Sequence, residues 1–140
     1  MKTPLFKPQT EWIPPTDFPD LRKYDEIAID LETKDPNLNE RMGSGSVVGV
    51  GDVVGISLAT HDWCAYYPIA HEGGGNMDRK MVLSWLQDQL RTDSTKIFHN
   101  AMYDICWLRA LGLQVNGQIV DTMIAASLID ENRYRYDLNG

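Results

Sequence analysis

The sequence of 140 residues has only two cysteines and no long apolar run. Cys64 and Cys106 lie far apart without a CxxC spacing, which argues against a disulfide framework and a zinc site. We expect core or semi-buried thiols in a reducing compartment. No signal peptide is evident, and no apolar run approaches the ~20 residues that span a membrane. We therefore expect a cytoplasmic protein, in host cytoplasm if the source is viral, without a membrane partner.

An excess of basic residues is also missing. The formal net charge is -7, with 13 Lys and Arg against 20 Asp and Glu. This balance argues against tight, sequence-independent binding of duplex DNA. It does not exclude a nuclease, because metal ions can offset the negative charge of local carboxylates and a neighbouring domain can hold the DNA strand. A hydrophobic content of 43% and a charged content of 24% indicate a soluble globular domain.

Proline and glycine divide the chain into a Pro-rich N-terminal arm at residues 1–24 and one domain at residues 25–140. Most of the seven prolines fall within residues 1–19, so the arm cannot be a regular helix or a central strand. We expect three aromatic residues, Phe6, Trp12 and Phe18, to pin it to the domain. Residues 33–51 form a predicted loop, whose glycines match no phosphate-binding loop.

The hydrophobic pattern of the domain predicts an α/β fold. Alternation predicts longer strands at 26–32, 53–60 and 63–70 and shorter ones at 96–98 and 119–120. Helical spacing predicts a helix capped by Asn76, a second at 101–111 stopped by Gly112, and a third capped by Asp121. The first of these helices carries an apolar stripe that we expect in the core: Met81, Val82, Trp85, Leu86 and Leu90. The order of elements indicates a mixed sheet flanked by helices.

Two carboxylates lie close together on the first predicted strand. Asp30 and Glu32 are two residues apart, so both side chains leave the same face. Crowded acids repel each other unless a cation lies between them, and a hard divalent cation such as Mg²⁺ or Mn²⁺ prefers oxygen ligands. The alternative is a solvated strand end with two ordinary acids. The short motif alone does not decide between them.

A second acidic motif lies at 97–104, where a short predicted strand runs into a helix. Asp104 follows Asn100 by four residues, on the same side of the first turn. Each residue has a plainer explanation: Asn100 as an N-cap, Asp104 as a complement to the helix dipole and Tyr103 as core. Their combination with the strand acids indicates three carboxylates that could hold two metal ions.

These two motifs resemble those of the DEDD 3′→5′ exonucleases. Asp30-x-Glu32 is similar to the first motif of that family. Asn100 to Asp104 is similar to the second, in which Asn is followed three and four residues later by an aromatic residue and Asp. Residues 54–59, 67–71 and 121–123 resemble segments in the same order in the proofreading domain of family A DNA polymerases. The resemblance covers the chain from about Ile27 onward.

The resemblance implies a ribonuclease H-like fold and a two-metal exonuclease that removes nucleotides from DNA 3′ ends. Asp30 would bridge two Mg²⁺ or Mn²⁺ ions, Glu32 would help to hold one, and Asp104 would bind the other, largely through water. The implied partners are a single-stranded DNA 3′ end and a C-terminal polymerase domain.

The substrate side of the site also follows from the resemblance. Asn100 would position the substrate or Asp104, and Thr33 would lie near the terminal nucleotide. Tyr103 belongs to this group, with packing as its alternative role. Leu38 is a candidate for the apolar wedge that the family carries after its first motif. We expect a structural or solvated role for His71, which ends a predicted strand.

The main departure from the family is its third motif, Tyr-x-x-x-Asp or His-x-x-x-x-Asp, which carries a fourth carboxylate. Leu138 stands where Asp would follow Tyr134, and His99 with Asp104 fits the second form only by using up the second motif. The family places this motif downstream of Gly140, so we expect part of a longer polymerase. A complete short protein with an incomplete site is the alternative. It would be an inactive ribonuclease H-like structural or partner-binding module. A stand-alone DEDD ribonuclease is a third hypothesis.

Overall fold

The computed structural model describes residues 17–35 and 51–123. In these ranges the chain forms, in order, β1 (Glu26–Lys34), β2 (Asp52–Ala59), β3 (Cys64–Pro68), α2 (Arg79–Leu90), β4 (Thr95–Phe98), α3 (Ala101–Ala110) and β5 (Ile119–Asp121). All five predicted strands and the first two predicted helices are confirmed, with ends that agree to within two residues. The third predicted helix, capped by Asp121, begins with Thr122 and Met123, which are helical, and the rest of it lies outside the described residues.

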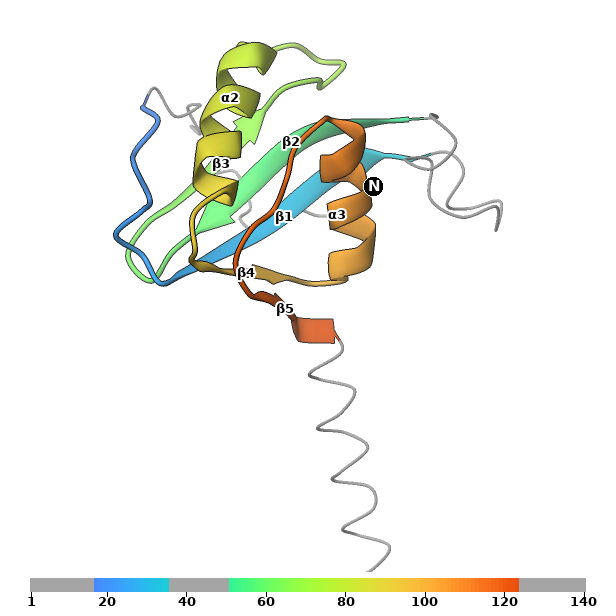
Figure 1. Cartoon of the computed structure of the whole chain (residues 1–140). Helices are drawn as coiled ribbons and strands as arrows, with labels where there is room; N and C mark the ends of the chain where they lie inside the picture. Colours follow the sequence, from blue (N-terminus) through green and yellow to red (C-terminus); the bar gives the residue numbers. More distant parts are fainter. Residues whose placement is uncertain (1–16, 36–50, 124–140) are drawn as a thin grey trace, which may run out of the picture.

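The strands form one mixed sheet in the order β3-β2-β1-β4-β5 (Figure 1). β2 is antiparallel to both β1 and β3, whereas β4 is parallel to β1 and β5 is parallel to β4. Both helices lie on the same side of this sheet (Figure 1). Each helix follows one strand and precedes the next, which is the usual way to connect parallel strands.

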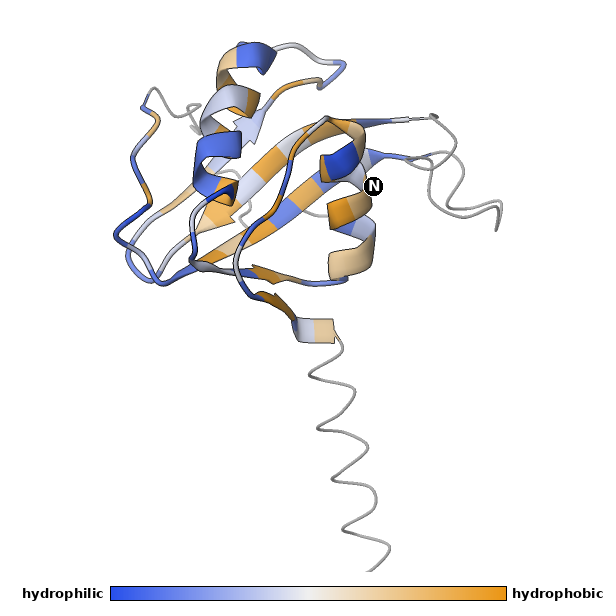
Figure 2. Cartoon of the chain, in the orientation of Figure 1, coloured by the Kyte–Doolittle hydropathy of each residue, from blue (hydrophilic) through white to orange (hydrophobic). Residues whose placement is uncertain are grey.

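β1 is the central strand, and its two faces differ in chemistry. Ile27, Ile29 and Leu31 are buried in the core together with apolar residues of β2, α2 and α3. The alternate positions carry Asp30 and Glu32, so the acids leave the face opposite to the helices. Figure 2 shows this alternation of hydrophobic and hydrophilic residues along β1. The sequence pattern therefore fixes the side of the sheet on which the acids lie.

The helix α2 is amphipathic, but its start differs from the prediction. Asp78 is the N-cap and accepts a hydrogen bond from the Met81 amide (3.1 Å). The predicted cap, Asn76, instead exchanges two hydrogen bonds with the backbone of His71. Val82, Leu86 and Leu90, spaced by four, form the buried stripe, whereas Met81 is 57% exposed. The expectation that Met81 belongs to the core is therefore wrong, because it lies one residue away from this stripe.

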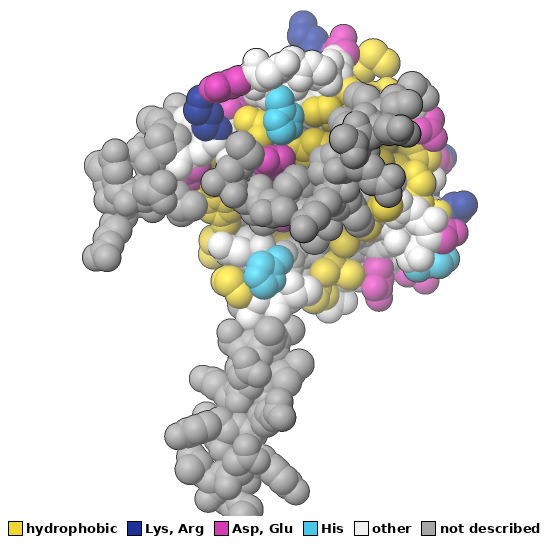
Figure 3. All heavy atoms as spheres, turned by 180° about the vertical axis from the view of Figure 1, so that it is seen from behind, with side chains coloured by type: hydrophobic (Ala, Val, Ile, Leu, Met, Phe, Trp, Pro, Cys, Tyr) yellow, Lys and Arg dark blue, Asp and Glu magenta, His cyan; other side chains and the backbone are white. Residues whose placement is uncertain are grey.

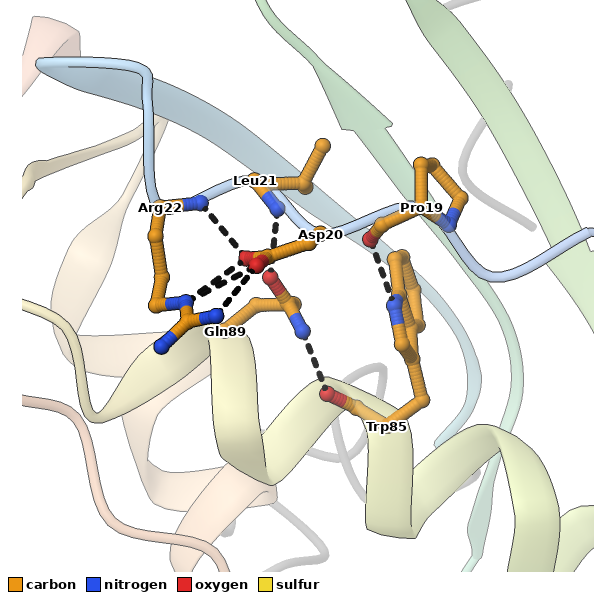
Figure 4. Close-up of polar contacts among 6 residues, drawn as sticks. All are labelled: Pro19, Asp20, Leu21, Arg22, Trp85 and Gln89. Atoms are coloured by element: carbon orange, nitrogen blue, oxygen red, sulfur yellow. Dashed lines mark hydrogen bonds and ion pairs between the residues drawn. The ribbon is translucent and has the colours of Figure 1, made fainter.

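The segment before β1 is anchored on α2 (Figure 4). The Trp85 indole donates to the Pro19 carbonyl (2.8 Å), and the Gln89 side chain accepts from the Leu21 amide (2.8 Å). Phe18 stacks on Tyr67 at a centroid distance of 5.6 Å, which confirms its expected role in pinning the arm. Residues 1–16, with Phe6 and Trp12, lie outside the described residues, and the boundary at residue 24 stays a prediction.

Two further expectations need correction. β1 extends to Lys34 through an irregularity between Glu32 and Thr33, so the loop begins later than residue 33. Cys64 is exposed rather than semi-buried, while Cys106 is partly buried as expected. Leu38, the wedge candidate, lies outside the described residues. Among the helices that the structure describes, none has the length and hydropathy of a membrane span.

Candidate active site

Asp30 and Glu32 are buried acids in the middle of the sheet. Each is only 5% exposed. On the neighbouring strand β2, Asp30 is paired with Ser57 and Glu32 with Gly55. Carboxylates are rarely buried unless hydrogen bonds or a cation compensate for the loss of water. The prediction that both acids leave one face is confirmed, and their burial argues against the plain solvated strand end.

Glu32 is held by two residues that the sequence analysis did not assign to the site. The Tyr66 hydroxyl, from β3, donates a hydrogen bond to Glu32 Oε2 (2.7 Å). His71 Nε2 hydrogen-bonds the same hydroxyl and lies 3.8 Å from Glu32 Oε2. Burial raises the pKa of the Tyr66 phenol well above its usual value, and the hydrogen bond to Glu32 raises this pKa further. Tyr66 therefore stays a hydrogen-bond donor at neutral pH.

Gly55 makes the contact between Tyr66 and Glu32 possible. It lies on β2, between the strands that carry the two residues. A Cβ atom at position 55 would lie 1.8 Å from the Tyr66 hydroxyl oxygen and 2.3 Å from the adjoining ring carbon. The phenol therefore crosses β2 through space that any other residue would fill. The clue in the sequence was a glycine inside a strand, which often marks a close approach of another group.

The second motif begins α3, at the end of β4. Asp104 is fully buried, at 0% exposed, on the side of α3 that also carries the core residues Ala101 and Leu108. Asn100 occupies the N-cap position with a left-handed backbone (φ 70°), but its side chain makes no cap hydrogen bond. Asn and Asp tolerate this conformation better than most residues. Asn100 is thus at the N-cap position but does not make the hydrogen bond that the plainer explanation, a simple N-cap, would require.

Asp121, at the end of β5, caps α3 instead. Its two carboxylate oxygens accept from the backbone amides of Asn100 (3.0 Å) and Ala101 (2.8 Å). One of them also accepts from the Met123 amide (2.9 Å), as expected of a cap for the following helix. A carboxylate at a helix N-terminus is favoured by the free amides and by the helix dipole. Of these two roles, the sequence predicts only the second, the cap of the following helix.

A direct contact joins the two motifs. Thr33 and Tyr103 are hydrogen-bonded through their hydroxyls (2.8 Å), and Tyr103 donates to Asp35 (3.1 Å). Thr33 directly follows Glu32 and Tyr103 directly precedes Asp104. β4 pairs with β1 only as far as Ala28, so the later part of β1 lies beside the start of α3. Two of the three predicted substrate residues therefore touch each other at the edge where α/β proteins commonly place their sites.

The three carboxylates themselves are not gathered into a ready-made metal centre. Within residues 17–35 and 51–123, no group of three or more His, Cys, Asp or Glu side chains has that arrangement. Asp30 and Glu32 leave the face away from the helices, whereas Asp104 lies on the buried side of α3. Their donor set consists of oxygen alone, which fits Mg²⁺ or Mn²⁺. The chemistry of the residues thus fits divalent ions, and their roles as ligands stay a prediction.

Charged side chains of both signs are visible among the described residues on the far side of the molecule. Figure 3 shows the molecule from the side opposite to Figure 1. On this side the described acidic side chains are scattered, and the described Lys and Arg side chains form no continuous basic surface.

Comparison with known proteins identifies the class to which this fold and these motifs belong. The family profile of the 3′-5′ exonuclease domain of DNA polymerase A matches residues 18–139. The chain belongs to this 3′-5′ exonuclease family.

Known relatives agree with this assignment. The chain is 32% identical over 146 residues to a DNA-directed DNA polymerase of Pseudomonas phage M6, which covers 99% of the chain and 22% of that protein. It is 32% identical over 123 residues to the DNA polymerase DpoZ of Acinetobacter phage SH-Ab 15497, covering 87% of the chain and 17% of that protein. The chain thus spans about a fifth of the length of these relatives. The resemblance to polymerase exonuclease domains is confirmed.

A solved structure supports the fold. The EXO domain of Aedes aegypti Nibbler superposes with a TM-score of 0.55 at 17% identity, over 81% of this chain and 50% of that chain. This likeness, together with the strand order and the position of the helices, confirms the predicted ribonuclease H-like fold. At this level of identity it carries no information on substrate.

Proposed function

We propose that the chain is the metal-dependent proofreading domain of a DNA polymerase, which removes nucleotides from single-stranded DNA 3′ ends. The observation that carries this proposal is the buried pair Asp30 and Glu32 on the central strand, next to the contact between Thr33 and Tyr103. Family membership gives the reaction class, and the two motifs give the residues.

The chain's own residues have separate tasks in this proposal. Asp30 and Glu32 supply oxygen ligands from a rigid central strand, and Asp104 supplies a third carboxylate from α3. When bound, two divalent ions lower the pKa of the attacking water and stabilise the leaving 3′ oxygen. The hydrogen-bonded pair of Thr33 and Tyr103 lies against the terminal nucleotide. Asn100 orients the substrate or Asp104 from its fixed backbone at the start of α3.

The acidic charge of the chain is consistent with a domain that acts beside another one. A net charge of -7 gives little attraction for a phosphate backbone. We infer that a C-terminal polymerase domain in the full-length protein holds the duplex and delivers the frayed 3′ end. Such a protein works in the cytoplasm of a cell or of an infected host.

An inactive ribonuclease H-like module is the second candidate. It is favoured by the lack of a ready group of three metal-ligating side chains among the residues that the structure describes, 17–35 and 51–123. In that case the domain would support a polymerase or bind a partner, and Asp30 would have no role in hydrolysis.

A digestion assay separates these proposals. The substrate is a labelled DNA primer with a frayed 3′ end, with Mg²⁺ or Mn²⁺ titrated from zero. It is tested with the 140-residue chain and with the product of the reading frame continued past Gly140. We expect metal-dependent 3′→5′ shortening that Asp30→Ala abolishes and that Asp88→Ala, an exposed acid on α2, leaves unchanged. Absence of digestion by both proteins with either metal would refute the enzymatic proposal. Preference for a ribonucleotide substrate would favour a ribonuclease.

A further inference from the structure

We propose that Tyr66 and His71 form a hydrogen-bonded brace that positions Glu32 as a metal ligand. We call these two residues the Tyr66–His71 brace. The proposal rests on the proposed function, since it gives Glu32 a task that matters only if the site holds cations. It adds two positioning residues that lie outside the two acidic motifs.

Tyr66 contacts the Glu32 carboxylate directly. The Tyr66 hydroxyl reaches Glu32 Oε2 at 2.7 Å across the strand that separates them, and both residues are buried. Gly55 keeps the path clear, because a Cβ there would lie 1.8 Å from the hydroxyl oxygen. A glycine in a strand interior costs stability through chain entropy and lost packing. Its presence at this point is explained by the room that the phenol needs.

The hydrogen bonds among His71, Tyr66 and Glu32 have a defined direction. A carboxylate can only accept, so the single hydrogen of the Tyr66 phenol goes to Glu32. The hydrogen in the contact between His71 and Tyr66 must then come from His71 Nε2. The chain of bonds runs from His71 through Tyr66 to Glu32, and each donor strengthens the next one.

His71 is itself fixed by Asn76. Its backbone amide donates to the Asn76 side chain (2.7 Å), and the Asn76 side-chain amide donates to the His71 carbonyl (2.9 Å). Between them, Gly74 and Gly75 adopt positive φ angles of 86° and 73°, which allow this tight loop. The loop from His71 to Asn76 is therefore closed by hydrogen bonds between its two ends. These bonds hold the backbone of His71 in place.

The consequence for Glu32 is a fixed carboxylate with its two oxygens in different roles. In the described part of the chain both contacts of this carboxylate, with Tyr66 and with His71, fall on Oε2. Oε1 is then the oxygen presented to a cation. Residues that orient a metal ligand in this way commonly contribute 10–100-fold to metal affinity or activity. The brace thus reduces the freedom that Glu32 would lose on binding a metal ion.

The test compares Tyr66→Phe with a matched control, Tyr67→Phe. The neighbouring Tyr67 is equally an internal tyrosine of β3, but its hydroxyl donates to the Asp17 carbonyl and not to Glu32. Two quantities are measured for each protein: the Mn²⁺ dissociation constant by electron paramagnetic resonance without DNA, and the Mn²⁺ concentration that half-saturates digestion. His71→Ala and His71→Gln form a second pair, because the Gln amide can replace the Nε2–H donor.

We expect Tyr66→Phe to raise both Mn²⁺ values about 10-fold or more, while the KM for DNA changes less than twofold. Tyr67→Phe should leave all three values unchanged. His71→Ala should weaken Mn²⁺ binding, and His71→Gln should restore most of it. Unchanged Mn²⁺ values in Tyr66→Phe would overturn the brace while the proposed function stands. If neither the 140-residue chain nor the protein extended past Gly140 shows Mn²⁺ binding or digestion that Asp30→Ala removes, both proposals fail together.

Discussion

The tightest packing constraint on the proposed site is at Gly55, and the substitution Gly55→Ala tests it. The added methyl would overlap the Tyr66 hydroxyl oxygen, at 1.8 Å, and two ring carbons, at 2.3 and 2.6 Å. The backbone at Gly55 has an ordinary strand conformation, so alanine itself is not strained there. The ring must therefore move, which breaks its bonds to Glu32 and His71.

The expected cost has two parts. Overpacking of a filled interior costs about 1–3 kcal/mol. Loss of a buried hydrogen bond to a charged group costs about 1.5–3 kcal/mol. Because displacement of the ring relieves part of the overlap, we expect a loss of about 3 kcal/mol in the free energy of unfolding. For a chain of this size that corresponds to a fall in Tm of about 10 °C.

A double-mutant cycle with Tyr66→Ala isolates this interaction. Without the phenol, Gly55→Ala should be neutral or slightly stabilising, because alanine is better than glycine in a strand interior. Urea unfolding of the four proteins should therefore give a coupling energy of about 3 kcal/mol. A loss below about 0.5 kcal/mol for Gly55→Ala, or additive effects of the two substitutions, would refute the proposed crossing of Tyr66 over Gly55.

Three further predictions concern stability. Asp121→Ala removes the cap of α3 and should cost about 1–2 kcal/mol in chemical unfolding, whereas the exposed Asp88→Ala should cost less than about 0.5 kcal/mol; equal effects would contradict the cap. Lys96 is fully buried, and its ammonium donates to the Thr92 and Ser94 carbonyls. Lys96→Met should therefore lower the free energy of unfolding by about 2 kcal/mol, whereas the exposed control Lys80→Met should not. A stabilised Lys96→Met variant would contradict this prediction. Burial raises the pKa of Tyr67 above its ordinary 10.0. The unfolded chain then loses this proton first, so stability should fall as the pH rises above about 10. Tyr67→Phe should make the fall shallower, and an unchanged slope would be the contrary result.

Local periodicity was sufficient to predict the elements of the fold. The alternation of Ile27, Ile29 and Leu31 with acids defines a strand with one apolar face, and the spacing of Val82, Leu86 and Leu90 defines a helix. Gly112, with φ 83°, ends α3 as predicted. These features depend on neighbours in the sequence, so the sequence alone reveals them.

Interactions between distant elements were not predictable in the same way. The contact between Tyr66 and Glu32 depends on the register of three strands, which no local pattern specifies. Asp121 caps a helix that begins 20 residues earlier, and the sheet must form before the two meet. The N-cap of α2 was predicted at Asn76 rather than Asp78 because both are good capping residues. Asn76 is instead engaged within its own loop, by two hydrogen bonds with the His71 backbone.

The most direct test of the account is a crystal structure of the chain grown with Mn²⁺, with anomalous scattering measured at the manganese edge. We expect an anomalous peak within about 2.5 Å of carboxylate oxygens of both Asp30 and Glu32, and its loss in a crystal of Asp30→Ala. Clear density for both side chains without such a peak, or manganese bound only to surface acids, would contradict the claim that these acids form a metal-dependent nuclease site.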